Sequence, residues 1–408
     1  MEEAAHPATT SPQQAETQAQ LHVLIESRAI WNALGGGLIG LTFGYLVFFG
    51  QRPALAGEGS IQFYSSIIGG VTAGVSFLLG YSLNARMANI WLGQRPKARQ
   101  LVDSLALLIV HSSIAVMACI GLFRLFQEAF IGLTVDDIAG AVLVAVAGGV
   151  ASYLSFNSGA RITAFSLSTL LATFMASGVL VSMLFAENPF WWHVMFSELG
   201  TGQAGLTSFW TFNTTLVVSG VIITTLTAFL TRDLEVWAAH RRRTVAQRLA
   251  ARAEARRKPS GHVPLRTRGV NALSGYIRTP RIMLLRVGMI GMGASLAGIG
   301  LIPMSLHHDG HVAATAAFAA FFLFLLMATP YILPGFPRSF FVFSYLAAAA
   351  LVFAFLLWRP VSYWNLTSME LIGVAILFAW LVVFIRNIAA LVERVRQMES
   401  VQPAAHEQ

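Results

Sequence analysis

Ionisable side chains gather in two connections in the second half of the chain. Residues 187–202 read ENPFWWHVMFSELGTG, and residues 301–314 read LIPMSLHHDGHVAA, with two histidines four residues apart. Imidazole nitrogens and carboxylate oxygens are ligands of Zn²⁺. One interpretation is a metal site made of His193, His307, Asp309 and His311. Histidines in connections are more often solvated or structural, so the metal site is the weaker interpretation.

A further acid, Glu370, lies within an apolar stretch near the end of the chain. The uncharged residues 371–385 separate it from Arg386 and span about 22 Å as a helix, less than the apolar thickness of about 30 Å. Glutamate is too short to reach the interface as arginine does, so Glu370 is expected to face a polar cavity or a partner. The predicted ligand-binding residues are Ser197, Glu198, Asn213, His311 and Glu370. Within this outward-facing site we expect Glu370 to pair with Asn213 or His311.

Motifs that bind cofactors are missing from the sequence. It contains no phosphate-binding loop, no Gly-rich dinucleotide fingerprint and no paired-cysteine metal motif. Cys119 is the one cysteine, so an intramolecular disulfide is excluded. No cofactor is therefore expected, and no catalytic residue is identified.

Long apolar stretches must position these residues. Hydrophobic residues make up 56% of the chain and charged residues 11%, which is typical of a membrane protein. A helix needs about 20 apolar residues to cross the hydrocarbon layer. The stretches that meet or approach this length are 30–49, 61–83, 104–123, 138–159, 162–186, 206–231, 287–306, 312–336, 339–358 and 366–387. The sequence therefore predicts an all-α fold, a polytopic transmembrane helical bundle of about ten spans.

The positive charges predict how these spans are oriented. With the amino terminus inside, only Arg52, Arg124 and Arg359 of the 27 Lys and Arg residues fall outside, in line with the excess of basic residues in cytoplasmic connections. Both termini are then cytoplasmic, with a disordered tail expected over 1–29 and a second tail over 397–408. The excess of arginine over lysine is typical of a GC-rich bacterial genome, so we expect a bacterial plasma membrane.

The longest cytoplasmic connection, 232–281, is strongly basic. Its first half is rich in helix formers, and we expect either a solvated helix that continues the sixth span or a helix held on anionic lipid headgroups. The arginines expected to contact lipid are Arg241, Arg242, Arg243, Arg248, Arg252, Arg256 and Arg257. The basic residues lie between spans rather than in a separate module, so the net charge of +8 does not indicate a nucleic-acid partner.

Glycines at intervals of four residues mark the first span, at Gly36, Gly40 and Gly44. Small side chains let helix backbones approach closely within a membrane. Packing within the molecule is the expected use of this stripe, and a homo-oligomer is the alternative.

The second part of the chain resembles a known family. The segments NPFWWHVMFSELGTG, SFWTFNTTLVVSG, GIGLIPMSLHHDGHVAATAAF and MELIGVAILFAW, in this order, resemble the bacterial membrane family called domain of unknown function 998. The resemblance covers about residues 161–396. It implies a six-span unit. The chain departs from that unit at its amino-terminal side, where a four-span region over 30–160 has no match in the family pattern. The family's recurring polar features correspond to Ser197, Glu198, Gly200, Asn213, His311 and Glu370.

Two classes of function remain open from the sequence. The family is similar in layout to the Frag/DRAM-like proteins, some of which are tied to lipid remodelling. This favours a protein that binds, moves or senses a lipid or amphiphile at the outer leaflet, with membrane lipids as its partners. The alternatives are an intramembrane lipid-modifying enzyme, with or without the assistance of a metal, and a small-solute permease. Few charges lie within the spans to carry coupling ions, which counts against a proton-driven pump.

Overall fold

Ten long helices make up most of the computed structural model, which describes residues 12–87, 93–94, 96–257 and 280–401. They are α1 (Pro12–Phe48), α2 (Ile61–Met87), α3 (Lys97–Ala129), α4 (Asp137–Ala160), α5 (Ala164–Leu184), α6 (Leu206–Arg257), α8 (Ile282–Leu301), α9 (His308–Ile332), α10 (Arg338–Trp358) and α11 (Leu366–Val401). Three short 3₁₀ helices, η2 (Trp191–His193), η3 (Phe196–Gly200) and η4 (Gly202–Ala204), connect α5 to α6. All ten long helices are apolar enough to cross a membrane, which confirms the predicted all-α polytopic bundle.

The first helix begins earlier than the sequence predicted. We expected a disordered tail over 1–29, but α1 starts at Pro12, so residues 12–29 are helical. Ile25 and Ala29 are buried in a hydrophobic cluster with Phe156 of α4. Glu26 accepts a hydrogen bond from the Tyr153 hydroxyl and forms an ion pair with Arg161. These contacts hold residues 25–29 of α1 against the end of α4, and residues 1–11 lie outside the described part of the chain.

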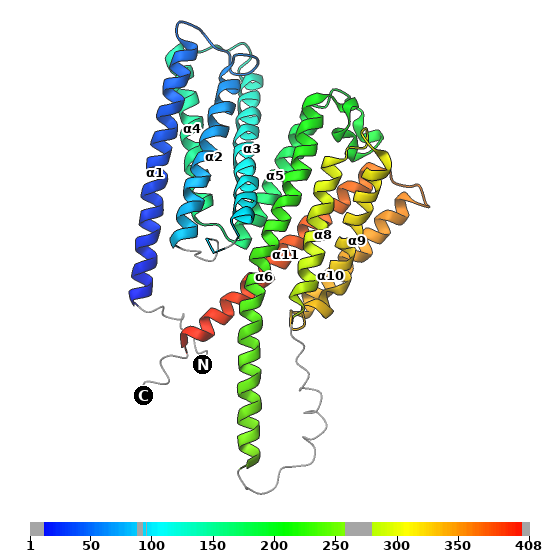
Figure 1. Cartoon of the computed structure of the whole chain (residues 1–408). Coiled ribbons are helices and arrows are strands. Elements are labelled where there is room, and N and C mark those ends of the chain that lie inside the picture. The colour runs from blue at the N-terminus through cyan, green and yellow to red at the C-terminus, as the bar shows by residue number, and fades with distance from the viewer. Residues whose placement is uncertain (1–11, 88–92, 95, 258–279, 402–408) are drawn as a thin grey trace, which may run out of the picture.

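Helices α1 to α4 form one group, coloured blue to green-cyan in Figure 1. A Cβ on Gly36 would lie 2.8 Å from the carbonyl oxygen of Gly148, and a Cβ on Gly40 would lie 2.7 Å from that of Val144. Helix α1 therefore approaches α4 too closely for any side chain at these positions. The glycine stripe of the first span therefore packs within the molecule, as expected, and the alternative of a homo-oligomer stays a prediction.

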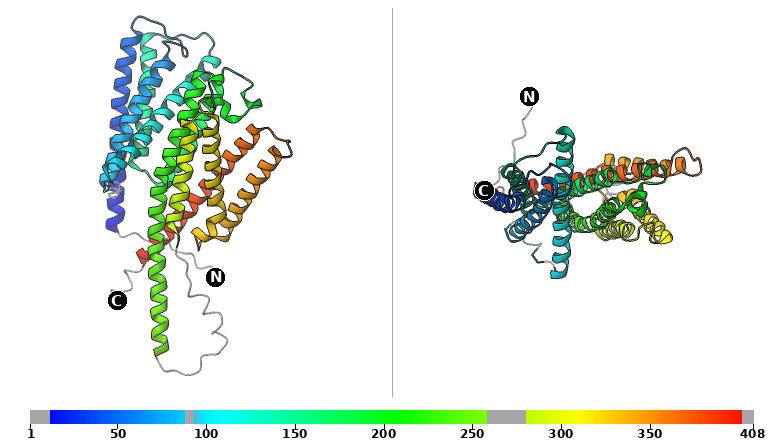
Figure 2. Two further views of the ribbon diagram at one scale, coloured as in Figure 1. Left: turned by 45° about the vertical axis from the view of Figure 1, so that its right-hand side comes forward. Right: turned by 90° about the horizontal axis from the view of Figure 1, so that it is seen from above.

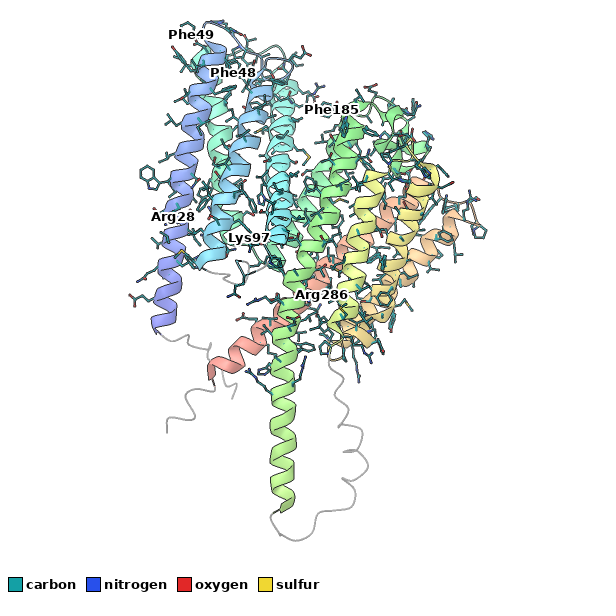
Figure 3. The ribbon with its side chains drawn as sticks, viewed as in Figure 1. Arg28, Phe48, Phe49, Lys97, Phe185 and Arg286 are labelled. Carbon is teal, nitrogen blue, oxygen red and sulfur yellow. The ribbon has the colours of Figure 1, made fainter. Side chains whose placement is uncertain are left out.

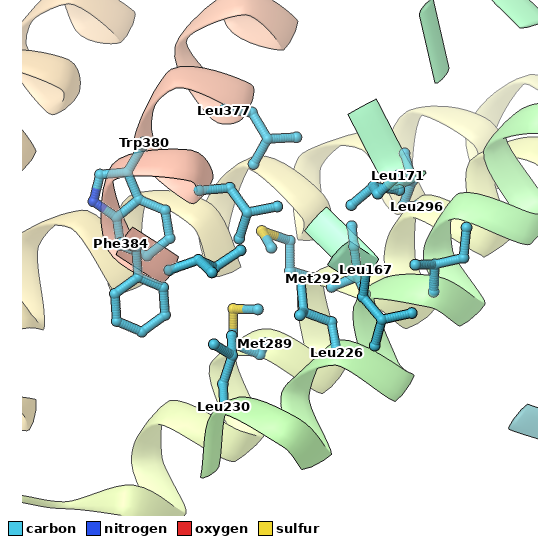
Figure 4. Packing of buried hydrophobic residues seen from close by; sticks show 14 of the residues in the cluster. Leu167, Leu171, Leu226, Leu230, Met289, Met292, Leu296, Leu377, Trp380 and Phe384 are labelled. Carbon is cyan, nitrogen blue, oxygen red and sulfur yellow. The ribbon is translucent and has the colours of Figure 1, made fainter. Parts of the chain in front are cut away.

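Helices α5 to α11 form the second group, around α6. Figure 4 shows leucines and methionines of α5, α6 and α8 packed together beside Trp380 and Phe384 of α11. Gly220 of α6 faces Gly293 of α8, where a Cβ on Gly293 would lie 2.6 Å from the carbonyl oxygen of Gly220. This close approach makes α6 and α8 the central pair of the group.

Helix α3 joins the two groups. It contacts α5 and α6 as well as α2, and both views of Figure 2 show it between α1 and α8. Leu107 of α3 and Leu167 of α5 belong to the same hydrophobic cluster. About one turn earlier in α3, Asp103 Oδ1 accepts a hydrogen bond from Thr225 Oγ1 of α6 at 2.9 Å. Apolar packing and a buried polar contact therefore hold the groups together.

The long helices run between two opposite ends of the molecule. Helix α1 begins and α11 ends at the same end as the basic half of α6, and the short helices η2 to η4 lie at the opposite end (Figure 1). We call the second one the outer end, because the charges predict that it faces outside. Within the predicted connection 232–281, α6 remains helical to Arg257, and Leu234 and Ala238 are buried. Residues 258–279 lie outside the described part.

Candidate functional site

A folded segment closes the outer end of the second helix group. We call residues 191–204 the outer cap; they comprise η2, η3 and η4. Every residue of η3 is buried, although Ser197 and Glu198 are polar. Short 3₁₀ turns leave several backbone groups without partners inside the turn, so neighbouring helices must supply them.

Glu370 of α11 supplies one of these partners. Its Oε2 atom accepts a hydrogen bond from the backbone N–H of Phe196 at 2.6 Å, and its Oε1 atom accepts one from Ser197 Oγ at 3.4 Å. A carboxylate that accepts from a backbone N–H forms a stronger bond than a neutral acceptor does. The prediction that Glu370 has a partner at this depth agrees with these contacts. The prediction that the partner is Asn213 or His311 is wrong.

Two further residues at the start of α11 hold the cap, and neither was among the residues predicted for the site. Asn365 Nδ2 and Thr367 Oγ1 donate to the carbonyl oxygen of Trp192 at 3.1 and 2.8 Å. Asn365 Oδ1 also accepts from Ser368 N at 2.9 Å, as a helix N-cap does. The sequence did contain a signal for this cap, because an Asn stands three residues before a Ser at the start of an apolar run, as it does at the beginning of many helices.

Helix α6 holds the other side of the cap. Asn213 Nδ2 donates to the carbonyl oxygen of Gly200 at 2.9 Å, and Ser208 Oγ donates to that of Leu199 at 2.9 Å. Gly200 has no room for a side chain, because a Cβ there would lie 2.8 Å from Asn213 Oδ1. Asn213 thus binds backbone in the closed cap, and α6 and α11 hold η3 between them.

Glu198 differs from the other predicted site residues. Its side chain is only 8% exposed, yet within the described part of the chain its carboxylate accepts no hydrogen bond. Its backbone carbonyl accepts from Thr201 N at 2.9 Å and from Thr201 Oγ1 at 2.8 Å. Of the five predicted ligand-binding residues, the structure joins only Ser197 and Glu370 through their side chains.

The histidines do not gather as a metal site. His307 is the N-cap of α9 and its Nδ1 accepts from Gly310 N at 2.9 Å, whereas the His311 ring is buried and its Nδ1 lies 2.9 Å from the Ile302 carbonyl oxygen. His193 stacks on Trp192 with ring centroids 3.7 Å apart. Among the described residues, no group of three or more His, Cys, Asp or Glu side chains is placed to hold a metal ion.

The predicted set of His193, His307, Asp309 and His311 is therefore wrong as a metal site. The spacing of four residues between His307 and His311 assumed that both belong to one helical face. His307 instead has an extended backbone, with φ of −153°, because it ends the preceding connection and caps the helix.

A groove of about 380 Å³ opens at the outer end where the two helix groups meet. Its walls include Phe63 and Ile67 of α2, Val116 and Ile120 of α3, and Phe185 just after α5. Figure 3 places Phe185 near the outer end of the molecule, as it does Phe48. Gln62, which also lines the groove, donates from Nε2 to the carbonyl oxygen of Ile120 at 2.7 Å. None of the five predicted ligand-binding residues lines this groove.

The basic half of α6 carries the arginines that were expected to contact lipid. The structure describes the side chains of Arg242 and Arg243, and both are exposed. The side chains of Arg241, Arg248, Arg252, Arg256 and Arg257 lie outside the description, although the helix itself reaches Arg257. Their contact with anionic lipid stays a prediction.

Together these elements define the class of protein. The chain is a multi-pass α-helical membrane protein with a capped outer end. Comparisons with family models, with curated proteins and with solved structures gave no match to it. The resemblance to domain of unknown function 998 therefore stays a prediction.

Proposed function

We propose that this protein binds a lipid or amphiphile from the outer leaflet and moves or senses it. The observation that carries this proposal is the groove of about 380 Å³ between α2, α3 and the end of α5. Phe63, Ile67 and Phe185 are among its lining residues and are exposed in a region that the bilayer would surround. Small-molecule sites commonly have volumes of about 300–1,000 Å³ and apolar walls with a few polar groups.

The two ends of this groove differ in chemistry. Ile67, Val116 and Ile120 offer an apolar wall for an acyl or alkyl chain, whereas Gly57 and Gln62 place polar atoms towards the outer connection. Gly57 N donates to Gln62 Oε1 at 3.3 Å, so the carboxamide is fixed in place. Such an arrangement suits an amphiphile whose polar group lies outward and whose chain lies along α2 and α3.

The position of the groove also favours movement or sensing over passive binding. Its walls come from both helix groups, because α2 and α3 belong to the first and Phe185 to the second. A ligand that contacts both groups stabilises the relative placement it binds best. The resemblance to domain of unknown function 998, whose layout is similar to that of the Frag/DRAM-like proteins, also supports a lipid as the ligand.

The alternative of a lipid-modifying enzyme has less support. Ser197 and Glu370 lie beside each other, but the same carboxylate also binds the backbone of Phe196 at 2.6 Å. A carboxylate that holds a folded segment in this way has a structural task. A small-solute permease would need a polar pathway, and the side chains of Ser197 and Thr201 in the outer cap instead bind Glu370 and a backbone carbonyl.

The experiment fills the groove without disturbing the core. Ile67→Trp places an indole in the groove from a position that is already exposed, and Val142→Trp places one on an exposed face of α4 as a control. Both full-length variants are reconstituted with a photoreactive phospholipid, and the crosslinked peptides are identified by mass spectrometry. We expect the wild type and Val142→Trp to crosslink at α2 and α3, and Ile67→Trp to lose this product. Equal crosslinking of all three proteins would overturn the proposal.

A further inference from the structure

A second groove lies at the end opposite the outer cap, on the surface of the first helix group. It has a volume of about 440 Å³ and runs between α1 and α2. Leu83 and Phe156 are buried and form its floor, whereas Leu79 and Met87 are exposed along its side. Met87 lies eight positions after Leu79, so the groove follows α2 for about 12 Å.

One charged side chain lines this groove, and it has no partner in the described part of the chain. Arg28 is exposed, and neither an ion pair nor a side-chain hydrogen bond is formed by its guanidinium there. The nearest acid along α1, Glu26, is already occupied by Tyr153 and Arg161. The other polar side chains of the groove donate to backbone carbonyls: Asn32 Nδ2 to Arg28 O and Ser82 Oγ to Leu79 O, each at 2.9 Å.

The depth of Arg28 in the membrane follows from its neighbours. Residues 30–49 of α1 are uncharged and long enough to cross the hydrocarbon layer, so Arg28 lies just outside that layer. Figure 3 places Arg28 towards the same end of the molecule as Lys97 and away from Phe48 and Phe49. Trp31, one turn further along α1, is 71% exposed, which suits an indole at the level of lipid headgroups.

We infer that the groove between α1 and α2 binds one anionic phospholipid of the cytoplasmic leaflet, with its phosphate on Arg28 and one acyl chain along α2. The guanidinium presents two parallel N–H donors that match phosphate oxygens. Leu79, Leu83 and Met87 provide an apolar surface that leads from this headgroup position into the hydrocarbon layer. The charge distribution places this end of the molecule in the cytoplasmic leaflet, where anionic lipids attract basic residues.

The site is distinct from the one proposed above. It lies at the opposite end of α2, it carries a fixed positive charge, and it shares no lining residue with the outer groove. It selects for the charge of the headgroup, whereas the outer groove offers only neutral polar atoms.

The test compares lipid headgroups on matched variants of the full chain. Native mass spectrometry counts bound phosphatidylglycerol and phosphatidylcholine on the wild type, on Arg28→Gln and on Arg124→Gln. Arg124 lies at the outer end, pairs with Glu128 and is 65% exposed, so its loss controls for net charge. We expect Arg28→Gln to weaken binding of phosphatidylglycerol about fivefold with little change for phosphatidylcholine, and Arg124→Gln to change neither.

A second variant tests the apolar part of the groove. Ser82 is exposed at its edge, so Ser82→Trp fills the groove without changing charge and is expected to weaken both lipids. Inorganic phosphate is added as a competitor, and it should not displace the lipid. Equal effects of Arg28→Gln and Arg124→Gln, unchanged binding by Ser82→Trp, or displacement by phosphate alone would each overturn the inference.

Discussion

Glu370 acts on the outer cap through two hydrogen bonds that end on adjacent residues. Phe196 N–H donates to one carboxylate oxygen and the Ser197 hydroxyl to the other. A hydrogen bond contributes about 0.5–1.5 kcal/mol net, and a buried donor that is left unpaired costs about 1–3 kcal/mol. The start of η3 therefore depends on a single side chain from α11.

This dependence predicts a local effect of substitution at Glu370. In Glu370→Ala we expect the backbone amide of Phe196 to exchange hydrogen about tenfold faster, because it loses its hydrogen-bond acceptor. Glu370→Gln keeps one carbonyl oxygen and should give an intermediate rate. Glu58→Gln, at an exposed acid of the first helix group, serves as the control. Hydrogen exchange with mass spectrometry measures all four proteins; an unchanged cap in Glu370→Ala would rule out the anchoring role.

The sequence predicted part of this arrangement. The distance of Glu370 from Arg386 required a partner at apolar depth, and one exists. Which group would be the partner could not be predicted. Almost every residue has a backbone N–H, and only the fold determines which of them lacks a backbone acceptor. For the same reason Asn213 was predicted to face a ligand, whereas it binds the carbonyl oxygen of Gly200.

The contact between α1 and α4 depends on glycine at defined positions. Gly40 faces the backbone of α4, where a Cβ would lie 2.7 Å from the Val144 carbonyl oxygen and 2.9 Å from Ala145 Cα. Gly35 lies in the same helix, and a Cβ there would meet nothing within 4 Å. These two glycines form a matched pair for testing helix packing.

We predict opposite results for alanine at the two positions. Gly40→Ala should lower the free energy of unfolding by about 1–3 kcal/mol, because backbone atoms of α4 must move. Gly35→Ala should raise it by as much as about 1 kcal/mol, because alanine favours helix. Reversible unfolding in mixed micelles measures both variants. Equal destabilisation would mean that the loss comes from removing glycine and has no relation to helix contact.

A carboxylate at the start of α4, outside the spans, is expected to make the stability of the fold depend on pH. The Ala139 N–H donates to Asp136 Oδ1 at 3.0 Å, and this bond holds the pKa of Asp136 below its ordinary value. A carboxylate with a lowered folded pKa stabilises the fold above its unfolded pKa of about 3.9, and this contribution is lost as the pH falls through the folded pKa.

Asp136→Ala should therefore lower the Tm at pH 7, and its difference from the wild type should shrink below about pH 4. Asp136→Asn keeps a capping oxygen that does not titrate, so it should remain close to the wild type at pH 7. Thermal scans across pH 3 to 7 provide the measurement. A difference between Asp136→Ala and the wild type that stays constant with pH would contradict this assignment.

The number of helices was predictable because each span needs a long apolar run, and the described part of the chain has ten such helices. Helix ends were harder to predict. Residues 12–29 lack an apolar run, so they were expected to be disordered, yet Glu26 and Ile25 bind them to α4. Contacts between distant parts of the chain decided that boundary.

Orientation of the whole molecule is open to direct measurement. Cysteine placed at Tyr363, which is 76% exposed at the outer end, should react with an impermeant thiol reagent added to intact cells. Cysteine placed at Arg243, exposed on the basic half of α6, should react only after the membrane is opened. The natural Cys119 is buried, so the wild type gives the background. If only the cysteine at position 243 reacted in intact cells, the orientation of the protein would be the reverse of the predicted one.

Helix α6 connects the outer cap to the far side of the membrane without a break. At 1.5 Å per residue its 52 residues extend about 78 Å. Its first turns bind the cap through Ser208 and Asn213, and its last turns carry the exposed Arg242 and Arg243. Because the helix is this long, a tilt of about 5° around its outer end would move the end near Arg257 sideways by about 7 Å. If the cap tilted α6 in this way, a small displacement at the outer end would become a larger one at the opposite end of the helix.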